Sequence, residues 1–374
     1  MSNENEVKLP NDYTPETAPT VFAVENTYHI MVSIPYPCLV WVKIGEEEYF
    51  DESNGIIRSQ SLVHRMIVPM PELDKAGKYT VCIRPLIERL PYFSKTAPVK
   101  EYEYSFYPVP DGKVRAYHIS DAHNLIDAPV KAAKAFGDID LLILNGDVID
   151  HSGDPSKFEN IYIICSELTG GTKPVIFSRG NHDMRGVFAE KFADYTPNSN
   201  GNTYYTFRLG KLWGLVLDCG EDKPDEHPEY GFTVACHRFR RRQTEFINRV
   251  ISEKTKEYEG DGVDVKLVIC HNPFTRKDNP PFDIEQELYA HWAELLREHI
   301  KPDLMICGHT HDTAVWEPGG RHDFLGQPCK IVIGSNVKKD IEKFIGCGYI
   351  FDENKTEIVF TDSDGNVQKP IRVI

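Results

Sequence analysis

Aspartate, histidine and asparagine residues recur in five short clusters in the second half of this 374-residue chain. The clusters read Asp121-Ala122-His123, Gly146-Asp147-Val148-Ile149-Asp150, Gly180-Asn181-His182-Asp183, His271-Asn272 and Gly308-His309-Thr310-His311. Carboxylate, imidazole and amide groups are the ligands that hard to borderline divalent ions prefer. These clusters contain more ligand side chains than one metal ion needs, whereas two ions that share a carboxylate would use all of them. Two ions about 3.5–4 Å apart can clamp a phosphate for in-line displacement, so these residue types favour phosphoester hydrolysis.

An apolar stretch precedes each cluster and predicts the element that positions it. These stretches span residues 114–119, 141–144, 175–178, 265–269 and 304–307. Short, continuous apolar runs of this kind are typical of strands that are covered on both faces. Because ligands bind beyond the carboxyl ends of strands in α/β sheets, we expect all five clusters to meet at one sheet edge.

The pattern of predicted elements changes near residue 112. Residues 20–110 contain short strand-like runs separated by turn residues, which predicts an all-β sandwich of the fibronectin or immunoglobulin kind. Two prolines and an Asp-Gly pair within residues 108–112 predict a domain boundary. Residues 113–374 alternate between strands and helices, with helices expected at 128–136, at 240–254 and from Asp283, where Gln286 suggests a capping box. Residues 1–19 are polar and predict a flexible arm.

Composition excludes several classes of protein. Acidic residues outnumber basic ones 57 to 42, giving a net charge of −15. A charge of this sign repels a phosphate backbone, so we do not expect a nucleic-acid partner. No apolar run reaches the ~20 residues of a membrane span, and the polar N-terminus as written is not a signal peptide. Nine scattered cysteines without a CxxC pair predict buried, reduced thiols. These features predict a cytoplasmic protein without a membrane partner, and the phosphate clamp inferred from the five clusters predicts a small phosphorylated substrate.

The ordered set DxH, GDxxD, GNHD, H and GHxH resembles the calcineurin-like metallophosphoesterase superfamily. The motifs cover residues 121–311, and the resemblance implies a four-layer α/β/β/α sandwich over residues 113–374. It also implies two metal ions. The first would be held by Asp121, His123, Asp147 and His311. The second would be held by Asp147, Asn181, His271 and His309. Asp147 would bridge them, and the sequence does not select among Mn, Fe and Zn.

The resemblance further implies roles for residues that do not bind metal. His182 would lie over the scissile phosphate, stabilise it and donate a proton to the leaving oxygen, and Asp150 would orient His182. Arg185 and Arg276 lie close to motifs in the sequence and are candidates for substrate binding.

Two branches of the superfamily are relevant. A β-sandwich before the catalytic domain resembles the purple acid phosphatases. That branch has an iron-binding tyrosine where this chain has Asp150, and it lacks the histidine found here as His123, so we expect no tyrosinate–iron centre. The GNHD motif followed by Met184-Arg185 resembles the bacterial cyclic-nucleotide phosphodiesterases.

The hypothesis is a phosphoesterase that hydrolyses mono- or diesters by in-line attack of a metal-bridging hydroxide. The alternatives are a cyclic-nucleotide phosphodiesterase and a catalytically silent binding module that retains the fold. The full ligand set disfavours the silent module. The monoester or diester preference, the natural substrate, the role of the β-sandwich and the oligomeric state are left open.

Overall fold

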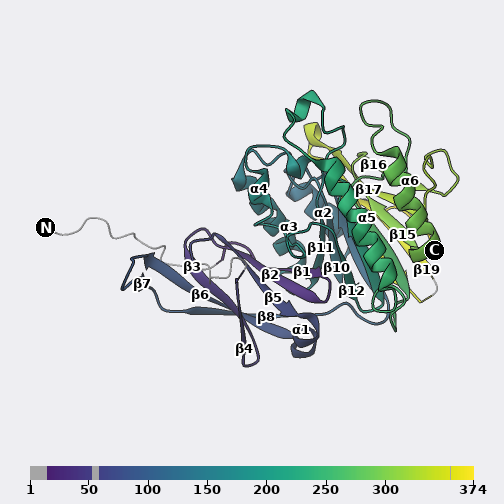
Figure 1. Cartoon of the computed structure of the whole chain (residues 1–374). Helices are drawn as coiled ribbons and strands as arrows, with labels where there is room; N and C mark the ends of the chain where they lie inside the picture. Colours follow the sequence, from purple (N-terminus) through teal and green to yellow (C-terminus); the bar gives the residue numbers. More distant parts are fainter. Residues whose placement is uncertain (1–14, 53–58, 354) are drawn as a thin grey trace.

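Two facing sheets form the centre of the α/β part of the chain in the computed structural model, which describes residues 15–52, 59–353 and 355–374 (Figure 1). In the first sheet, parallel strands β9 (Val114–Ile119), β10 (Leu141–Asn145) and β11 (Pro174–Ser178) lie beside antiparallel β18 (Lys343–Asp352), β19 (Lys355–Asp362) and β20 (Ile371–Arg372). The second sheet contains β12 (Tyr205–Leu209), β13 (Leu212–Leu217), β14 (Val265–Cys270), β15 (Leu304–Cys307) and β16 (Asp312–Trp316). Strand β17 (Lys330–Lys338) joins the two, because its first half pairs with β15 and its second half with β18. Both sheets are mixed.

Helices cover the outer face of each sheet. The helices are α2 (Asp127–Phe136), α3 (Glu159–Thr169), the short α4 (Ala189–Phe192), α5 (Cys236–Ser252) and α6 (Gln286–Leu295). Strand β10 shows why both faces are apolar. Leu141 and Ile143 belong to the core shared with the second sheet, whereas Leu142 and Leu144 pack in the core that contains α2 and α3. Alternation with a period of two therefore builds an α/β/β/α arrangement. Residues of α5 and α6 form the third core against the second sheet.

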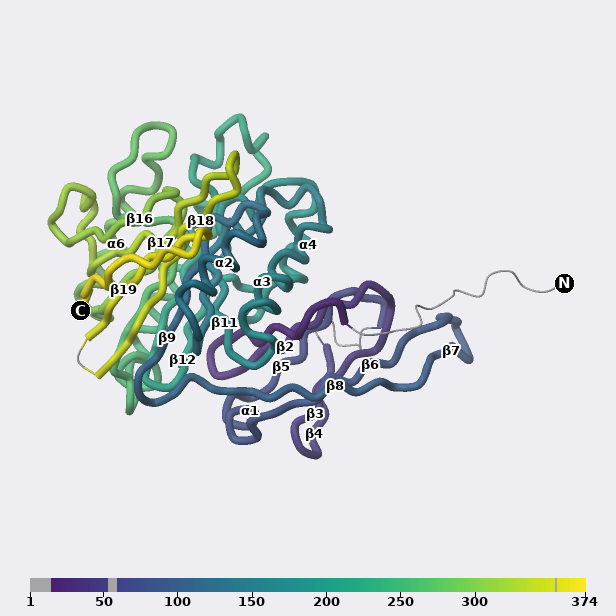
Figure 2. The backbone as a smooth tube through the Cα atoms, turned by 180° about the vertical axis from the view of Figure 1, so that it is seen from behind, coloured from purple at the N-terminus to yellow at the C-terminus, as the bar shows by residue number. Residues whose placement is uncertain are grey.

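The N-terminal strands differ from the expectation. Strand β1 (Thr20–Val24) pairs in parallel with β11, and β2 (Thr27–Ser33) and β5 (Val63–Pro69) follow it, so these strands extend the first sheet. A separate antiparallel sheet contains β3 (Cys38–Ile44), β4 (Glu47–Phe50), β6 (Lys78–Glu88), β7 (Lys95–Thr96) and β8 (Lys100–Ser105) (Figure 2). The predicted independent sandwich of fibronectin or immunoglobulin type is not confirmed. All residues of β1 are buried, which suits an interior strand, but a local pattern does not identify its partner.

Some local expectations also change. Helix α1 (Met70–Ala76) lies within the region predicted to be all β, and α3 is a helix that the sequence pattern does not predict. The predicted capping box at Asp283 is wrong: α6 begins at Gln286 after Glu285, which has a left-handed φ of 54° and makes no side-chain cap. Residues 1–14 of the predicted arm lie outside the described residues. The domain boundaries at residues 20–110 and 113–374 stay a prediction.

Within the described part of the chain, no helix combines the length and apolar character needed to cross a membrane. All nine cysteines are buried thiols, as the sequence predicted. The cytoplasmic location stays a prediction.

Candidate metal centre and active site

The clusters that follow β9, β10, β11, β14 and β15 converge at one edge of the two sheets. His271 Nε2 lies 3.1 Å from Asp147 Oδ2 and 3.7 Å from Asp121 Oδ1, although these residues come from three different strands. His311 Nε2 lies 3.3 Å from Asp121 Oδ1, and His309 Nδ1 lies 3.1 Å from Asn181 Oδ1. The expectation from strand order is met for all seven predicted ligands: the structure brings them together.

Three groups of side chains at this edge have the geometry to hold a metal ion. They are Asp121–His123–His311, His123–Asp147–His182 and Asp147–His271–His309, with the ligand atoms of each group within 4.8 Å of one another. Asp147 belongs to two groups. His123 Nε2 and His311 Nε2 lie 3.0 Å apart, so two imidazole nitrogens point at the same small space.

The backbone of the ligand residues is held in an unusual conformation. Positive φ angles between 47° and 68° occur at Asp121, His123, Asp147, His309 and His311. Non-glycine residues adopt this region uncommonly, and such strain clusters at functional sites. Backbone hydrogen bonds stabilise it: Asp121 N donates to Gly146 O (3.0 Å) and His123 N to Asp147 O (3.0 Å). Gly180 is required nearby, because a Cβ there would clash with the Asp147 carboxylate.

The electrostatics of this edge suit bound cations. Asp121 and Asp147 are buried side by side, an arrangement that is unfavourable without positive charge. Burial alone would lower the pKa of His271, but Asp147 and Asp121 outweigh it and raise that pKa to about 10. Burial lowers the pKa of both His123 and His309 to about 4, which keeps these imidazoles neutral and free to ligate at neutral pH. His271 Nε2 has no well-aligned hydrogen bond among the described residues. The donor set therefore fits metal ions.

His182 is oriented by backbone groups. Its N–H donates to Asp147 Oδ1 (2.9 Å), and its Nδ1 lies 2.7 Å from the backbone carbonyl oxygen of Asp150. Nδ1 therefore carries the proton of that hydrogen bond, and Nε2 lies on the side of the ring that faces Arg185. Asp150 contacts His182, as expected, but the hydrogen bond comes from its backbone carbonyl oxygen and not from its carboxylate. That carboxylate lies 3.1 Å from His123 Nδ1 and is paired with Lys339, because the turn after β10 presents the Asp150 carbonyl to His182.

The two arginines predicted to bind substrate lie in different surroundings. Arg185 Nη1 is 3.3 Å from His182 Nε2, so Arg185 stands beside the proposed acid. Arg276 pairs with Asp278 at 2.7 Å and lines a small separate hollow with Phe274 and Phe282. Of the two predicted arginines, Arg185 lines a cavity together with His182, and Arg276 does not.

Sequence reasoning missed the residues that hold Arg185. Glu221 accepts from Arg185 Nε (3.1 Å) and Nη2 (2.8 Å), and Asp222 accepts from Nη2 (3.1 Å). Glu221 is 1% exposed, and its loop is fixed by buried Arg240, whose Nε donates to Cys219 O at 2.7 Å. The signal in the sequence is an acidic loop that follows the apolar run of β13. The structure adds that the end of β13 lies beside the end of β14.

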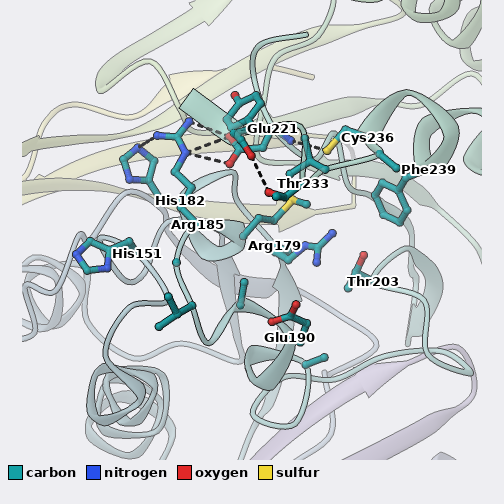
Figure 3. A pocket seen from close by; sticks show the side chains of 18 of the residues that line it. His151, Arg179, His182, Arg185, Glu190, Thr203, Glu221, Thr233, Cys236 and Phe239 are labelled. Atoms are coloured by element: carbon teal, nitrogen blue, oxygen red, sulfur yellow. Dashed lines mark hydrogen bonds and ion pairs between the residues drawn. The ribbon is translucent and has the colours of Figure 1, made fainter. Parts of the chain in front are cut away.

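A cavity of about 1140 Å³ opens beside His182 and Arg185 (Figure 3). Its walls come mainly from the segments around α4 and the start of α5. In the view of Figure 3, His182 and Arg185 lie on one side and Thr203 and Phe239 on the other. None of the seven predicted metal ligands lines it, so the cavity extends away from the ligand cluster.

Comparison with known proteins agrees with this geometry. The sequence model of the calcineurin-like phosphoesterase family matches residues 114–313, more than half of the chain. The chain belongs to the calcineurin-like phosphoesterase family. This calcineurin-like protein is therefore a metal-dependent phosphoric ester hydrolase, and the resemblance inferred from the motifs is confirmed.

Individual relatives share a quarter or less of their residues with this chain. A probable cyclic nucleotide phosphodiesterase of Rhodopseudomonas palustris is 25% identical over 215 residues, covering 54% of this chain and 68% of the relative. A purple acid phosphatase from yellow lupin seeds aligns with a TM-score of 0.55 and 12% identity, over 95% of this chain and 74% of the lupin chain. A dimetal phosphatase from Danio rerio gives a TM-score of 0.46 and 13% identity, over 71% of this chain and 99% of the other. At these identities, the lupin structure supports the fold alone.

Proposed function

We propose that this calcineurin-like protein hydrolyses small phosphate mono- or diesters with two metal ions. The first ion would be held by Asp121, His123, Asp147 and His311, and the second by Asp147, Asn181, His271 and His309. The observation that supports this proposal most is the position of Asp147. A carboxylate oxygen of Asp147 lies within 4.8 Å of ring nitrogens of His123 and His182 in one group and of His271 and His309 in another. Asp147 Oδ1 also accepts the backbone N–H of His182. Mn, Fe and Zn all suit this mixed nitrogen and oxygen set.

When bound, the ions supply Lewis acidity and a nucleophile for in-line displacement at phosphorus. The protein's own residues perform the remaining tasks. His182 Nδ1 donates to a carbonyl oxygen, so Nε2 is the nitrogen left to face the leaving oxygen. His182 acts as an acid there in the form in which both ring nitrogens carry a proton, and the Nε2 proton passes to the leaving oxygen. Arg185 stabilises the charge that develops on the phosphate. Glu221 and Asp222 accept hydrogen bonds from its Nε and Nη2 groups, and its Nη1 lies 3.3 Å from His182 Nε2 and 3.7 Å from Glu229 Oε1. Arg185 therefore faces the phosphate through Nη1 rather than as a two-pronged clamp.

A cyclic-nucleotide phosphodiesterase is the second candidate, favoured by the name of the R. palustris relative. The net charge of −15 disfavours extended nucleic acids and is compatible with a small nucleotide.

The test compares hydrolysis of p-nitrophenyl phosphate and bis-p-nitrophenyl phosphate by Mn-reconstituted protein. His182→Ala and Asp147→Asn serve as controls. Diester turnover that both substitutions abolish supports a phosphodiesterase, and cyclic nucleotides are then assayed directly. Monoester preference indicates a phosphatase. Turnover of neither ester by protein shown to bind two ions contradicts the general hydrolase proposal and favours the binding-module alternative.

A further inference from the structure

The cavity beside His182 lies on the side of the site where a general acid must deliver its proton. A general acid has to reach the leaving oxygen within hydrogen-bond distance. His182 and Arg185 line this cavity, whereas the ligand cluster lies beyond its edge. A substrate whose leaving oxygen touches His182 Nε2 therefore extends its leaving group into the cavity. We propose that this cavity is the leaving-group site and that it selects uncharged leaving groups with an apolar or aromatic body. This inference rests on the proposed role of His182.

The charges of the cavity wall disfavour a second anion on the leaving group. Both guanidinium groups in the described wall already have a carboxylate partner: Arg179 pairs with Asp218 at 2.7 Å, and Arg185 with Glu221 at 2.8 Å. Glu190 also lines the cavity and is exposed. A phosphate or carboxylate on the leaving group would thus face two arginines that are already paired and one exposed carboxylate. It would lose its hydration without gaining an ion pair.

The remaining wall is largely apolar. It includes Met184, Val187, Ala193, Val234 and Phe239. Val187 is 79% exposed and Phe239 is partly exposed, although both side chains are apolar. Apolar side chains around a hollow with few polar groups are typical of ligand sites, where the ligand body covers them. The volume of about 1140 Å³ accommodates a leaving group of more than one ring.

The experiment measures kcat/KM for three leaving groups on the Mn-loaded protein: phenyl, 2-naphthyl and 6-carboxy-2-naphthyl phosphate. If the protein hydrolyses bis-p-nitrophenyl phosphate faster than p-nitrophenyl phosphate, the methyl phosphodiesters of the same three aryl alcohols are used instead. We expect 2-naphthyl to exceed phenyl by about tenfold, because the second ring is buried in the cavity. We expect the carboxylated ester to fall about tenfold below 2-naphthyl, although its alcohol is the better leaving group.

Two substitutions localise the effect. Phe239→Ala removes an apolar wall, and Ala193→Trp fills the cavity from an exposed position; both lower the ratio of 2-naphthyl to phenyl kcat/KM towards one. Phe93→Ala is the matched control, because Phe93 is 95% exposed and lies outside the cavity, and it leaves the ratio unchanged. The ratio is taken within each variant, and thermal unfolding checks that each variant folds.

The failure of this inference differs from failure of the proposed function. Equal kcat/KM for the three esters, or a ratio insensitive to Phe239→Ala and Ala193→Trp, overturns the leaving-group site while hydrolysis persists. A carboxylated ester that is hydrolysed faster than 2-naphthyl phosphate also overturns it. Absence of metal-dependent turnover with every ester, by contrast, overturns the proposed function itself.

Discussion

The ligand edge and the cavity wall lie next to each other but are built differently. We define the ligand edge as Asp121, His123, Asp147, Asn181, His271, His309 and His311. The cavity wall is the set of residues that line the cavity, most of which lie within 184–193 and 229–239. Ligand-edge residues follow buried strands directly, and several have left-handed backbones fixed by neighbouring turns. The cavity wall consists of loops and helix ends, and Arg185 at its margin is positioned by carboxylates from a loop about 36 residues away.

This difference separates chemistry from selectivity. The end of a strand is held in place by its neighbours in the sheet, so the fold fixes the position of a metal-ligating residue that directly follows it. A loop is free to vary, so the residues that contact the leaving group are easier to change without disturbing the metal site. We expect substitutions at the ligand edge to affect every substrate and substitutions in the cavity wall to affect some substrates more than others.

The largest effect is expected at the ligand edge. Asp147→Ala removes the carboxylate shared by two ligand groups and should lower kcat/KM about 10³-fold for all esters, with loss of bound metal. Steady-state kinetics and metal analysis of the purified variant measure this. A variant that retains its metal content and near wild-type kinetics would contradict the proposal that both ions share the Asp147 carboxylate.

Asp150→Asn tests a residue at the border of the two regions. Its carboxylate lies 3.1 Å from His123 Nδ1, so its loss should weaken metal binding about 10- to 100-fold. A Mn²⁺ titration of the metal-depleted variant measures the affinity. A drop in kcat at saturating metal, without a change in affinity, would instead favour the original expectation that Asp150 acts on His182.

Glu221→Gln tests how the cavity margin is positioned. The substitution removes the charge that holds Arg185, and we expect kcat/KM to fall about tenfold with metal affinity unchanged. Glu190→Gln is the control, because this exposed carboxylate lines the same cavity without an ion pair to Arg185 among the described contacts. Equal effects of the two substitutions would contradict a positioning role for Glu221.

The smallest effect concerns a buried histidine outside both regions. Burial, with Arg65 nearby, lowers the pKa of His29 to about 3, so it stays neutral in the fold while the unfolded chain takes up a proton near pH 6.5. Stability is therefore lost as the pH falls from 6.5 towards 3, by up to about 1.4 kcal/mol per pH unit. His29→Gln should make the pH dependence of the free energy of unfolding shallower by that amount. Urea unfolding at pH 7 and pH 5 measures it, and parallel pH dependences in the two proteins would show that His29 is not responsible.

The ligand edge was predictable from sequence, whereas its surroundings were not. Strands β9, β10, β11, β14 and β15 begin and end within one residue of the predicted ranges, because continuous apolar runs report burial on both faces. The contacts of Arg185 depend on a loop that is remote in sequence, and no local pattern pairs them. Strand β1 likewise joins β11 some 150 residues later. For Asp150 the motif was informative, but whether its carbonyl or its carboxylate faces His182 depends on the turn geometry.

The number of ions bound tests the central claim most directly. Metal-depleted protein is titrated with Mn²⁺ by calorimetry while hydrolysis of the preferred p-nitrophenyl ester is followed at each ratio. We predict that the wild-type protein binds two equivalents and that its activity depends on them. His271→Ala should still bind one equivalent, because the group around Asp121, His123 and His311 stays complete. A single equivalent in the wild-type protein, or full hydrolysis by metal-free protein, would contradict the proposed two-metal site.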